Sequence, residues 1–124
     1  MSLELKDKKW SIGFSYAWEG IVQVVKLERN FQIHLITALL VIIAGFILGL
    51  SRMEWIFIVI AIGIVLIAEM INSTIERIMD YIKPDIHPAA KQIKDMAAGG
   101  VLIAAVAAFI IGLFIFIPNI IALF

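Results

Sequence analysis

The chain contains no cysteine, and only 16% of its 124 residues are charged. Without cysteine it can form no disulfide, no thiol nucleophile and no thiolate metal site. Soluble domains are about 45–50% apolar and about 25% charged, whereas 63% of this chain is hydrophobic. A soluble domain of this length buries only about two-thirds of its unfolded surface, which is too little for so much apolar sequence. The absence of cysteine, the low charge and the excess of apolar residues exclude a soluble enzyme, a nucleic-acid-binding protein and a secreted disulfide-stabilised domain.

The sequence has three long apolar stretches. A helix needs about 20 mainly apolar residues to cross about 30 Å of hydrocarbon, and the stretches at about 33–50, 55–78 and 97–117 meet this requirement. A hairpin at 51–54 joins the first two, and a polar segment with two prolines precedes the third. We predict an all-α membrane protein with three transmembrane helices, forming one membrane-embedded domain over residues 1–124. With no signal peptide before it, the first span is expected to be a permanent anchor.

The ten basic residues predict the orientation of these spans. Nine of them lie before the first span or from the last turn of the second onward, and the hairpin between these spans holds only Arg52. Lysine and arginine concentrate in cytoplasmic segments. We therefore expect a cytoplasmic N-terminus and a C-terminus on the opposite side of the membrane.

Residues 11–27 predict a further helix that is too polar to span. Apolar side chains recur there at helical spacing, and polar ones fall mostly between them. An amphipathic helix of this kind lies on the membrane surface, here on the cytoplasmic face. The pattern by itself fits a simple surface anchor as well as a functional element.

Glu69 lies well inside a predicted span, where a carboxylate costs roughly 2.5–3.5 kcal/mol. Counted from Trp55 at 1.5 Å per residue, Glu69 lies about 21 Å deep, about 9 Å short of the cytoplasmic interface. Helical spacing places Asn72, Glu76 and Asp80 on the same stripe. Like charges four residues apart repel, so a cation or a proton is expected there, and oxygen ligands favour Mg²⁺ over Zn²⁺. Solvated carboxylates at a helix end would explain Asp80, but not Glu69.

Further charged residues are expected at the same cytoplasmic level. Glu28 precedes the first span, and Lys94 and Asp95 precede the third. Carboxylates that hold Mg²⁺, a cation for phosphate oxygens and a partly buried carboxylate that accepts a hydroxyl proton are the groups that phosphoryl transfer uses. Lys94 taken alone is equally well explained as an ordinary interfacial lysine.

Three motifs carry a resemblance to a known family. The segment 68–76, A-E-M-I-N-S-T-I-E, resembles the E-x-x-N-[ST]-x-x-E signature of small bacterial integral-membrane lipid kinases. His87 precedes Lys94-Asp95 by seven residues as in a second signature, and the segment 27–31, L-E-R-N-F, is similar to a third block. In order and spacing the chain resembles the prokaryotic diacylglycerol kinase family. The form E-R-N-F-x-I-H resembles its Gram-positive branch, whose preferred acceptor is undecaprenol.

The resemblance implies a homotrimer with shared active sites in the bacterial cytoplasmic membrane. It implies transfer of the ATP γ-phosphate to a lipid alcohol, with undecaprenol favoured and diacylglycerol as the alternative acceptor. By position, Glu69 is the general base, Asn72 positions groups around it, and Glu28 and Glu76 hold the Mg²⁺ that accompanies ATP. The other residues that the resemblance assigns to nucleotide binding are Lys9, Tyr16, Asp85, His87, Lys94 and Asp95. His34 stands where the diacylglycerol branch has a carboxylate, so its role stays open.

Two other functions fit part of the sequence. A small oligomeric proton-coupled transporter could use Glu69 as its proton-carrying carboxylate. That function leaves Glu28, Asn72 and Glu76 unexplained. A membrane scaffold or regulatory subunit without chemistry is the third possibility, and failure of the protein to bind Mg-ATP would favour it.

Overall fold

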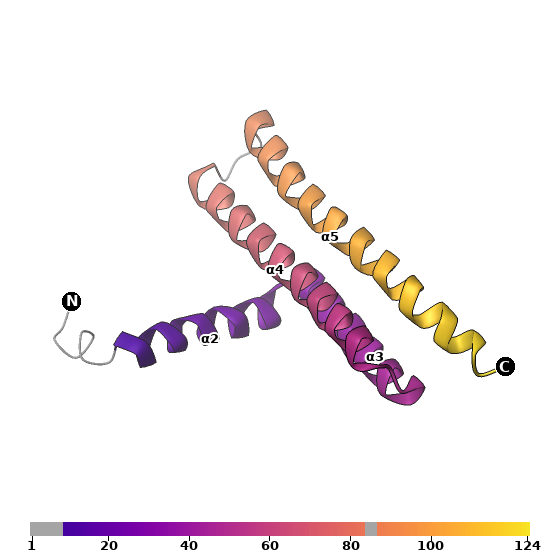
Figure 1. Cartoon of the computed structure of the whole chain (residues 1–124). Helices are drawn as coiled ribbons and strands as arrows, with labels where there is room; N and C mark the ends of the chain where they lie inside the picture. Colours follow the sequence, from indigo (N-terminus) through magenta and orange to yellow (C-terminus); the bar gives the residue numbers. More distant parts are fainter. Residues whose placement is uncertain (1–8, 84–86) are drawn as a thin grey trace.

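The regular structure is entirely α-helical in the computed structural model, which describes residues 9–83 and 87–124 and side chains from residue 13 onward. The helices are α2 (Lys9–Leu27), α3 (Arg29–Leu48), α4 (Arg52–Ile82) and α5 (Pro88–Ile121). Figure 1 shows α3, α4 and α5 as an elongated bundle, from which α2 points away. The predicted all-α fold is confirmed.

Three of these helices have the length and apolar composition to cross a membrane, namely α3, α4 and α5. They contain 20, 31 and 34 residues, which correspond to about 30, 46 and 51 Å of helix. The last two exceed the hydrocarbon thickness of about 30 Å, so they extend beyond the predicted spans. Large apolar side chains face outward, for example Phe46 and Phe114 with exposed fractions of 75% and 77%. The chain is a multi-pass membrane protein.

A tight reversal joins α3 to α4. Gly49 ends α3 in the left-handed conformation, with φ 69° and ψ 54°, and its N–H donates to the Gly45 carbonyl at 3.0 Å. The Ser51 hydroxyl accepts from the Glu54 N–H at 3.2 Å, and the Ser51 N–H donates to the Glu54 carboxylate at 2.9 Å. This capping box satisfies donors at the start of α4. We call the end of the bundle that holds this turn the hairpin end.

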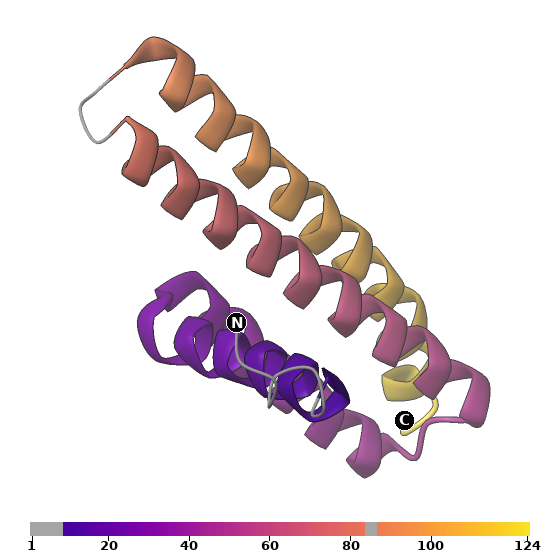
Figure 2. The ribbon, with the colours of Figure 1, turned by 90° about the vertical axis from the view of Figure 1, so that its left-hand side faces the viewer.

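Helix α5 runs antiparallel to α4, and the two lie side by side in Figures 1 and 2. At the hairpin end, the Asn119 side-chain amide donates to the Glu54 carboxylate at 2.7 Å. At the opposite end, which we call the loop end, Lys94 Nζ donates to Asp80 Oδ1 at 2.5 Å. These two contacts fix the register of α5 on α4.

Helix α2 meets the bundle partway along α4. The chain turns between α2 and α3 at Glu28, which has an extended backbone. The Gln32 side-chain amide donates to the Val25 carbonyl at 2.7 Å and so ties the two helices together. Phe14 and Trp18 are more than half exposed. Their exposure fits an amphipathic helix that lies in a membrane surface.

Replacing Gly49 with alanine should lower the free energy of unfolding by about 1 kcal/mol, because a Cβ is disfavoured at this φ. No atom lies within 4 Å of the position that the Cβ would take, so the loss would come from the backbone alone. The measurement is denaturant unfolding of the purified protein in micelles, followed by tryptophan fluorescence. As control, Gly20→Ala adds a methyl group in open space inside α2 and should cause no loss. Equal stability of Gly49→Ala and wild type would contradict the strained cap.

Candidate active site

The buried face of α4 changes from apolar to polar along its length. Toward the hairpin end it buries Ile58 and Val65, and farther along it buries Glu69, Asn72 and Ser73. The last three retain exposed fractions of only 2%, 4% and 3%. Glu69 and Asn72 therefore lie together on the inner face, as the helical spacing indicates.

His34 of α3 faces Glu69 across the hairpin. Its Nε2 lies 3.7 Å from Glu69 Oε2, and the exposed fractions of the two side chains are 26% and 3%. This separation exceeds the length of a hydrogen bond. Sequence reasoning missed the pair. His34 precedes Ser51 by 17 residues, and Glu69 follows Arg52 by 17. Because residues at equal distances from a hairpin lie opposite each other in two antiparallel helices, the predicted hairpin was enough to predict this pair.

Two further carboxylates lie near Glu69. Glu76 follows Glu69 by seven residues, about two turns along α4, and Glu28 lies beside Arg77 at the same end of that segment. The Asn72 side-chain amide donates to Glu76 Oε1 at 3.5 Å, and Arg77 Nη2 lies 3.6 Å from Glu28 Oε1. The ion pair of Arg77 with Glu28 was not predicted. We call the following set the junction cluster, because it gathers where α2, α3 and α4 meet: Glu28, His34, Glu69, Asn72 and Glu76.

The α5 residues of the predicted site lie farther toward the loop end. Lys94 pairs with Asp80, and Lys91 pairs with Asp95 at 2.6 Å. Asp80 follows Glu69 by 11 residues, which is about 16 Å along the helix. The sequence predicts Lys94 at the level of Glu76. In the structure it lies one helical turn farther toward the loop end, beside Asp80. Within one chain, the structure does not bring Lys94 and Asp95 to Glu69.

The remaining predicted residues are scattered. His87 is the N-cap of α5, where its Nδ1 accepts from the Ala89 N–H at 3.1 Å. Tyr16 is 62% exposed on α2. The Lys9 side chain and the whole of Asp85 lie outside the described residues.

Two buried oxygens in and beside the junction cluster have no hydrogen-bond partner among the described residues, Asn72 Oδ1 and Ser73 Oγ. An unsatisfied buried polar group costs about 1–3 kcal/mol. Such groups are expected where a ligand completes the bonding.

The donor set around Glu69 fits Mg²⁺ bound together with a nucleotide. In the described part of the chain, no three acidic or histidine side chains are grouped tightly enough to hold a metal ion by themselves. Mg²⁺, however, usually takes only one or two carboxylates and completes its shell with water and substrate phosphates. Glu28 and Glu76 could supply these two carboxylates.

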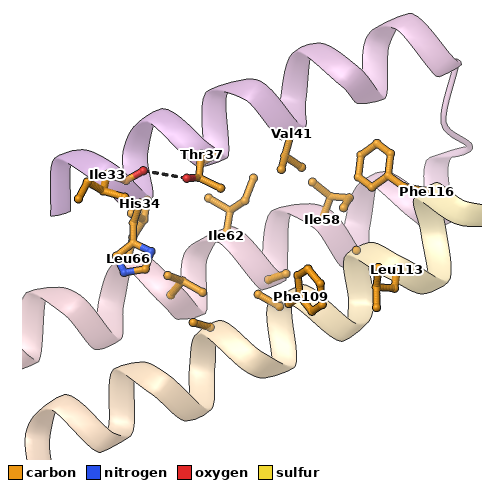
Figure 3. Close-up of a pocket in the computed structure, with 16 residues that line it drawn as sticks. Ile33, His34, Thr37, Val41, Ile58, Ile62, Leu66, Phe109, Leu113 and Phe116 are labelled. Carbon is orange, nitrogen blue, oxygen red and sulfur yellow. Dashed lines mark hydrogen bonds between the residues drawn. The ribbon is translucent and has the colours of Figure 1, made fainter. Parts of the chain in front are cut away.

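An apolar groove opens beside the junction cluster between α3 and α5, with α4 as its floor (Figure 3). Its volume is about 490 Å³, within the range of small-molecule sites. It runs from His34 toward Phe116, and Ala105, Ala108 and Gly112 of α5 leave the space. Along α4 it extends from residue 58 to residue 66, about 12 Å. We call it the α3–α5 groove. Its shape suits one hydrocarbon chain.

Comparison with known proteins identifies the class. A sequence profile described as prokaryotic diacylglycerol kinase matches residues 15–116. The chain is 44% identical over 106 residues to the undecaprenol kinase of Bacillus subtilis, covering 86% of each protein. It is 35% identical over 113 residues to the diacylglycerol kinase of Synechocystis, covering 90% of this chain and 65% of that protein. It is 28% identical over 95 residues to the diacylglycerol kinase of Escherichia coli, covering 77% and 78%.

Fold and comparisons together define an integral-membrane enzyme, a lipid kinase with ATP as co-substrate. The chain belongs to the prokaryotic diacylglycerol kinase family. The resemblance inferred from its motifs is confirmed.

The ion pair of Asp80 with Lys94 should be weak enough for phosphate to displace it. The exposed fractions of the two side chains are 63% and 35%, and exposed pairs contribute about 0.2–1 kcal/mol. A double-mutant cycle with Asp80→Asn and Lys94→Met, measured by denaturant unfolding, should give a coupling energy in that range that falls as salt is added. The same cycle on Asp80 and Lys91 should give none. A salt-independent coupling of several kcal/mol would show that Lys94 is not available to a nucleotide.

Proposed function

We propose that this chain transfers the γ-phosphate of ATP to the hydroxyl group of a membrane lipid alcohol, with undecaprenol as the favoured acceptor and undecaprenyl phosphate as the product. The observation that carries the proposal is the position of the buried Glu69 carboxylate beside His34, which lines one end of the apolar α3–α5 groove. A lipid chain in that groove would present its hydroxyl to the carboxylate. Diacylglycerol is the alternative acceptor, since relatives carry both names. Membership of a lipid kinase family removes the support for a transporter.

Glu69 acts as the general base in this proposal. Its carboxylate accepts the proton as the O–H bond of the acceptor breaks, and the oxygen forms a bond to the γ-phosphorus. The bond from that phosphorus to the β,γ-bridging oxygen breaks, and its electron pair leaves with ADP. Asn72 positions groups around Glu69: its amide donates to Glu76, and its buried Oδ1 is available to accept.

Glu28 and Glu76 hold Mg²⁺ in this proposal. The ion would neutralise charge on the phosphate oxygens of ATP. The two carboxylates come from different helices, and Arg77 and Asn72 hold them in place. Lys94 contacts phosphate, and the residues proposed to line the rest of the nucleotide site are Lys9, Tyr16, Asp85, His87 and Asp95.

A homotrimer with shared sites would complete this arrangement. In one chain Lys94 lies at the level of Asp80, about 16 Å along α4 from Glu69. A second copy could supply its α5 to the junction cluster, and the exposed apolar faces of the bundle leave room for such contacts. We propose the bacterial cytoplasmic membrane as the location, with the N-terminus and the loop end cytoplasmic and the hairpin end outside. The whole chain, residues 1–124, is the kinase domain.

Phosphate transfer to undecaprenol should be faster than transfer to diacylglycerol, and both should require Glu69. The measurement is transfer of labelled phosphate from ATP to each lipid in mixed micelles, with kcat/KM compared at equal lipid mole fraction. Glu69→Gln keeps the shape but cannot accept a proton, and should lower kcat by about 10²-fold or more. Glu19→Gln, an exposed substitution on α2, serves as control.

The outcomes separate the parts of this proposal. A higher kcat/KM with diacylglycerol would reverse the choice of acceptor and leave the chemistry intact. Wild-type activity in Glu69→Gln would remove Glu69 as the base.

Replacement of either proposed metal ligand should weaken binding of the metal–nucleotide complex. Mn²⁺ can stand in for Mg²⁺, and its binding in the presence of ATP can be followed by electron paramagnetic resonance without turnover. Glu28→Gln and Glu76→Gln should each raise the dissociation constant by about tenfold, because each removes a charged ligand. Glu19→Gln should leave it unchanged. Unaltered Mn²⁺ binding in both variants would place the metal elsewhere.

A further inference from the structure

His34 is the member of the junction cluster that has no task in the proposed mechanism. It lines the α3–α5 groove, whose wall is otherwise apolar except for Thr37. The Thr37 hydroxyl already donates to the Ile33 carbonyl at 2.9 Å, as the dashed line in Figure 3 shows. The His34 imidazole makes no hydrogen bond within the described residues, and it faces the Glu69 carboxylate. His34 thus offers the uncommitted polar group of the groove.

The spacing of His34 and Glu69 suits an oxygen atom placed between them. Their Nε2 and Oε2 atoms are 3.7 Å apart, too far for a direct hydrogen bond. One oxygen at about 2.8 Å from each atom spans that separation. A hydroxyl group can use both contacts at once, because it can accept a hydrogen bond and donate another.

The groove determines which hydroxyl could arrive there. In Figure 3 the labelled side chains form a row with Ile33 and His34 at one end and Leu113 and Phe116 at the other. An apolar chain along this row would place its polar head beside His34 and Glu69. Opposite Glu69, the register of α5 presents small residues, among them the buried Ala104. Because α5 has no polar side chain at this level, only α3 and α4 can supply polar contacts to the head group.

We propose that His34 positions the acceptor: its Nε2–H donates to the hydroxyl oxygen of the lipid alcohol while that O–H donates to Glu69. The inference deepens the proposed kinase function and rests on it. During transfer the hydroxyl proton passes to the Glu69 carboxylate, the oxygen bonds to the γ-phosphorus, and the β,γ-bridging bond breaks toward ADP. His34 keeps its own proton throughout. His34 contributes by orienting the hydroxyl group. This effect would apply to any lipid alcohol bound in the groove.

Two substitutions of His34 test this role. His34→Gln retains a side-chain N–H that can reach the same position, whereas His34→Leu removes the donor and keeps an apolar side chain. Kinetics are measured with varied lipid at saturating Mg-ATP and with varied Mg-ATP at saturating lipid. The leucine variant should lose about tenfold in kcat/KM for the lipid, the effect of one lost hydrogen bond. Its KM for Mg-ATP should stay within about twofold of wild type, and the glutamine variant should recover most of the loss.

A matched control separates positioning from general damage to the bundle. Thr74→Val also replaces a polar group by an apolar one, but Thr74 is exposed and its hydroxyl donates to the Met70 carbonyl of its own helix. All its kinetic constants should equal those of wild type. Circular dichroism and gel filtration check that each variant keeps its helices and its assembly.

Three results would overturn the role of His34. They are equal losses in the leucine and glutamine variants, wild-type lipid kinetics in the leucine variant, and a loss confined to KM for Mg-ATP. If wild type transfers phosphate in a Glu69-dependent way while both His34 variants match it, only the role of His34 falls. If wild type phosphorylates no lipid alcohol, the proposed function fails and the role of His34 fails with it.

Discussion

Burial of the Glu69 carboxylate is the constraint on which the rest of the structure depends. An isolated buried charge is costly, and this side chain retains only 3% of its exposed surface. Asn72, Ser73 and His34 surround it with polar atoms, two of which still lack partners among the described residues. The bundle therefore holds a polar group that it satisfies incompletely. Apolar packing farther along α4, around Ile58, stabilises the bundle that holds this site.

The short hairpin converts this burial into a defined geometry. Gly49 and the Ser51–Glu54 capping box fix where α3 ends and α4 begins. The levels of all residues on the two helices follow from that point, so His34 must face Glu69. The register of α5 on α4 is set by the contacts of Asn119 with Glu54 and of Lys94 with Asp80. This register places small α5 residues beside Glu69. The α3–α5 groove exists because Ala105, Ala108 and Gly112 of α5 leave space between the helices.

The sequence predicts the helical fold well because membrane solvation requires long apolar segments and internally satisfied backbone. The sequence predicts the ends of the helices less well. Helices α4 and α5 continue past the apolar stretches, because helical hydrogen bonding does not stop at the membrane–water interface. Helical spacing also predicts that Glu69 and Asn72 share a face. It does not predict contacts between helices, such as His34 with Glu69, because these depend on the register that the hairpin imposes. Lys94 was expected at the level of Glu76, but the start of α5 at Pro88 places it opposite Asp80.

The unequal lengths of α3 and α4 explain how a water-soluble and a lipid-soluble substrate could meet at one carboxylate. Helix α3 begins at the level of Arg77, where that side chain meets Glu28, whereas α4 continues to Ile82. The chain turns into α2 at this step (Figure 1). On the loop side of the step, the Asp80 side chain is 63% exposed, so charged groups there are accessible to a nucleotide. On the hairpin side lies the apolar groove. Glu69 lies between the step and the groove, so a base at this position could act on a lipid hydroxyl and on a phosphate group at once.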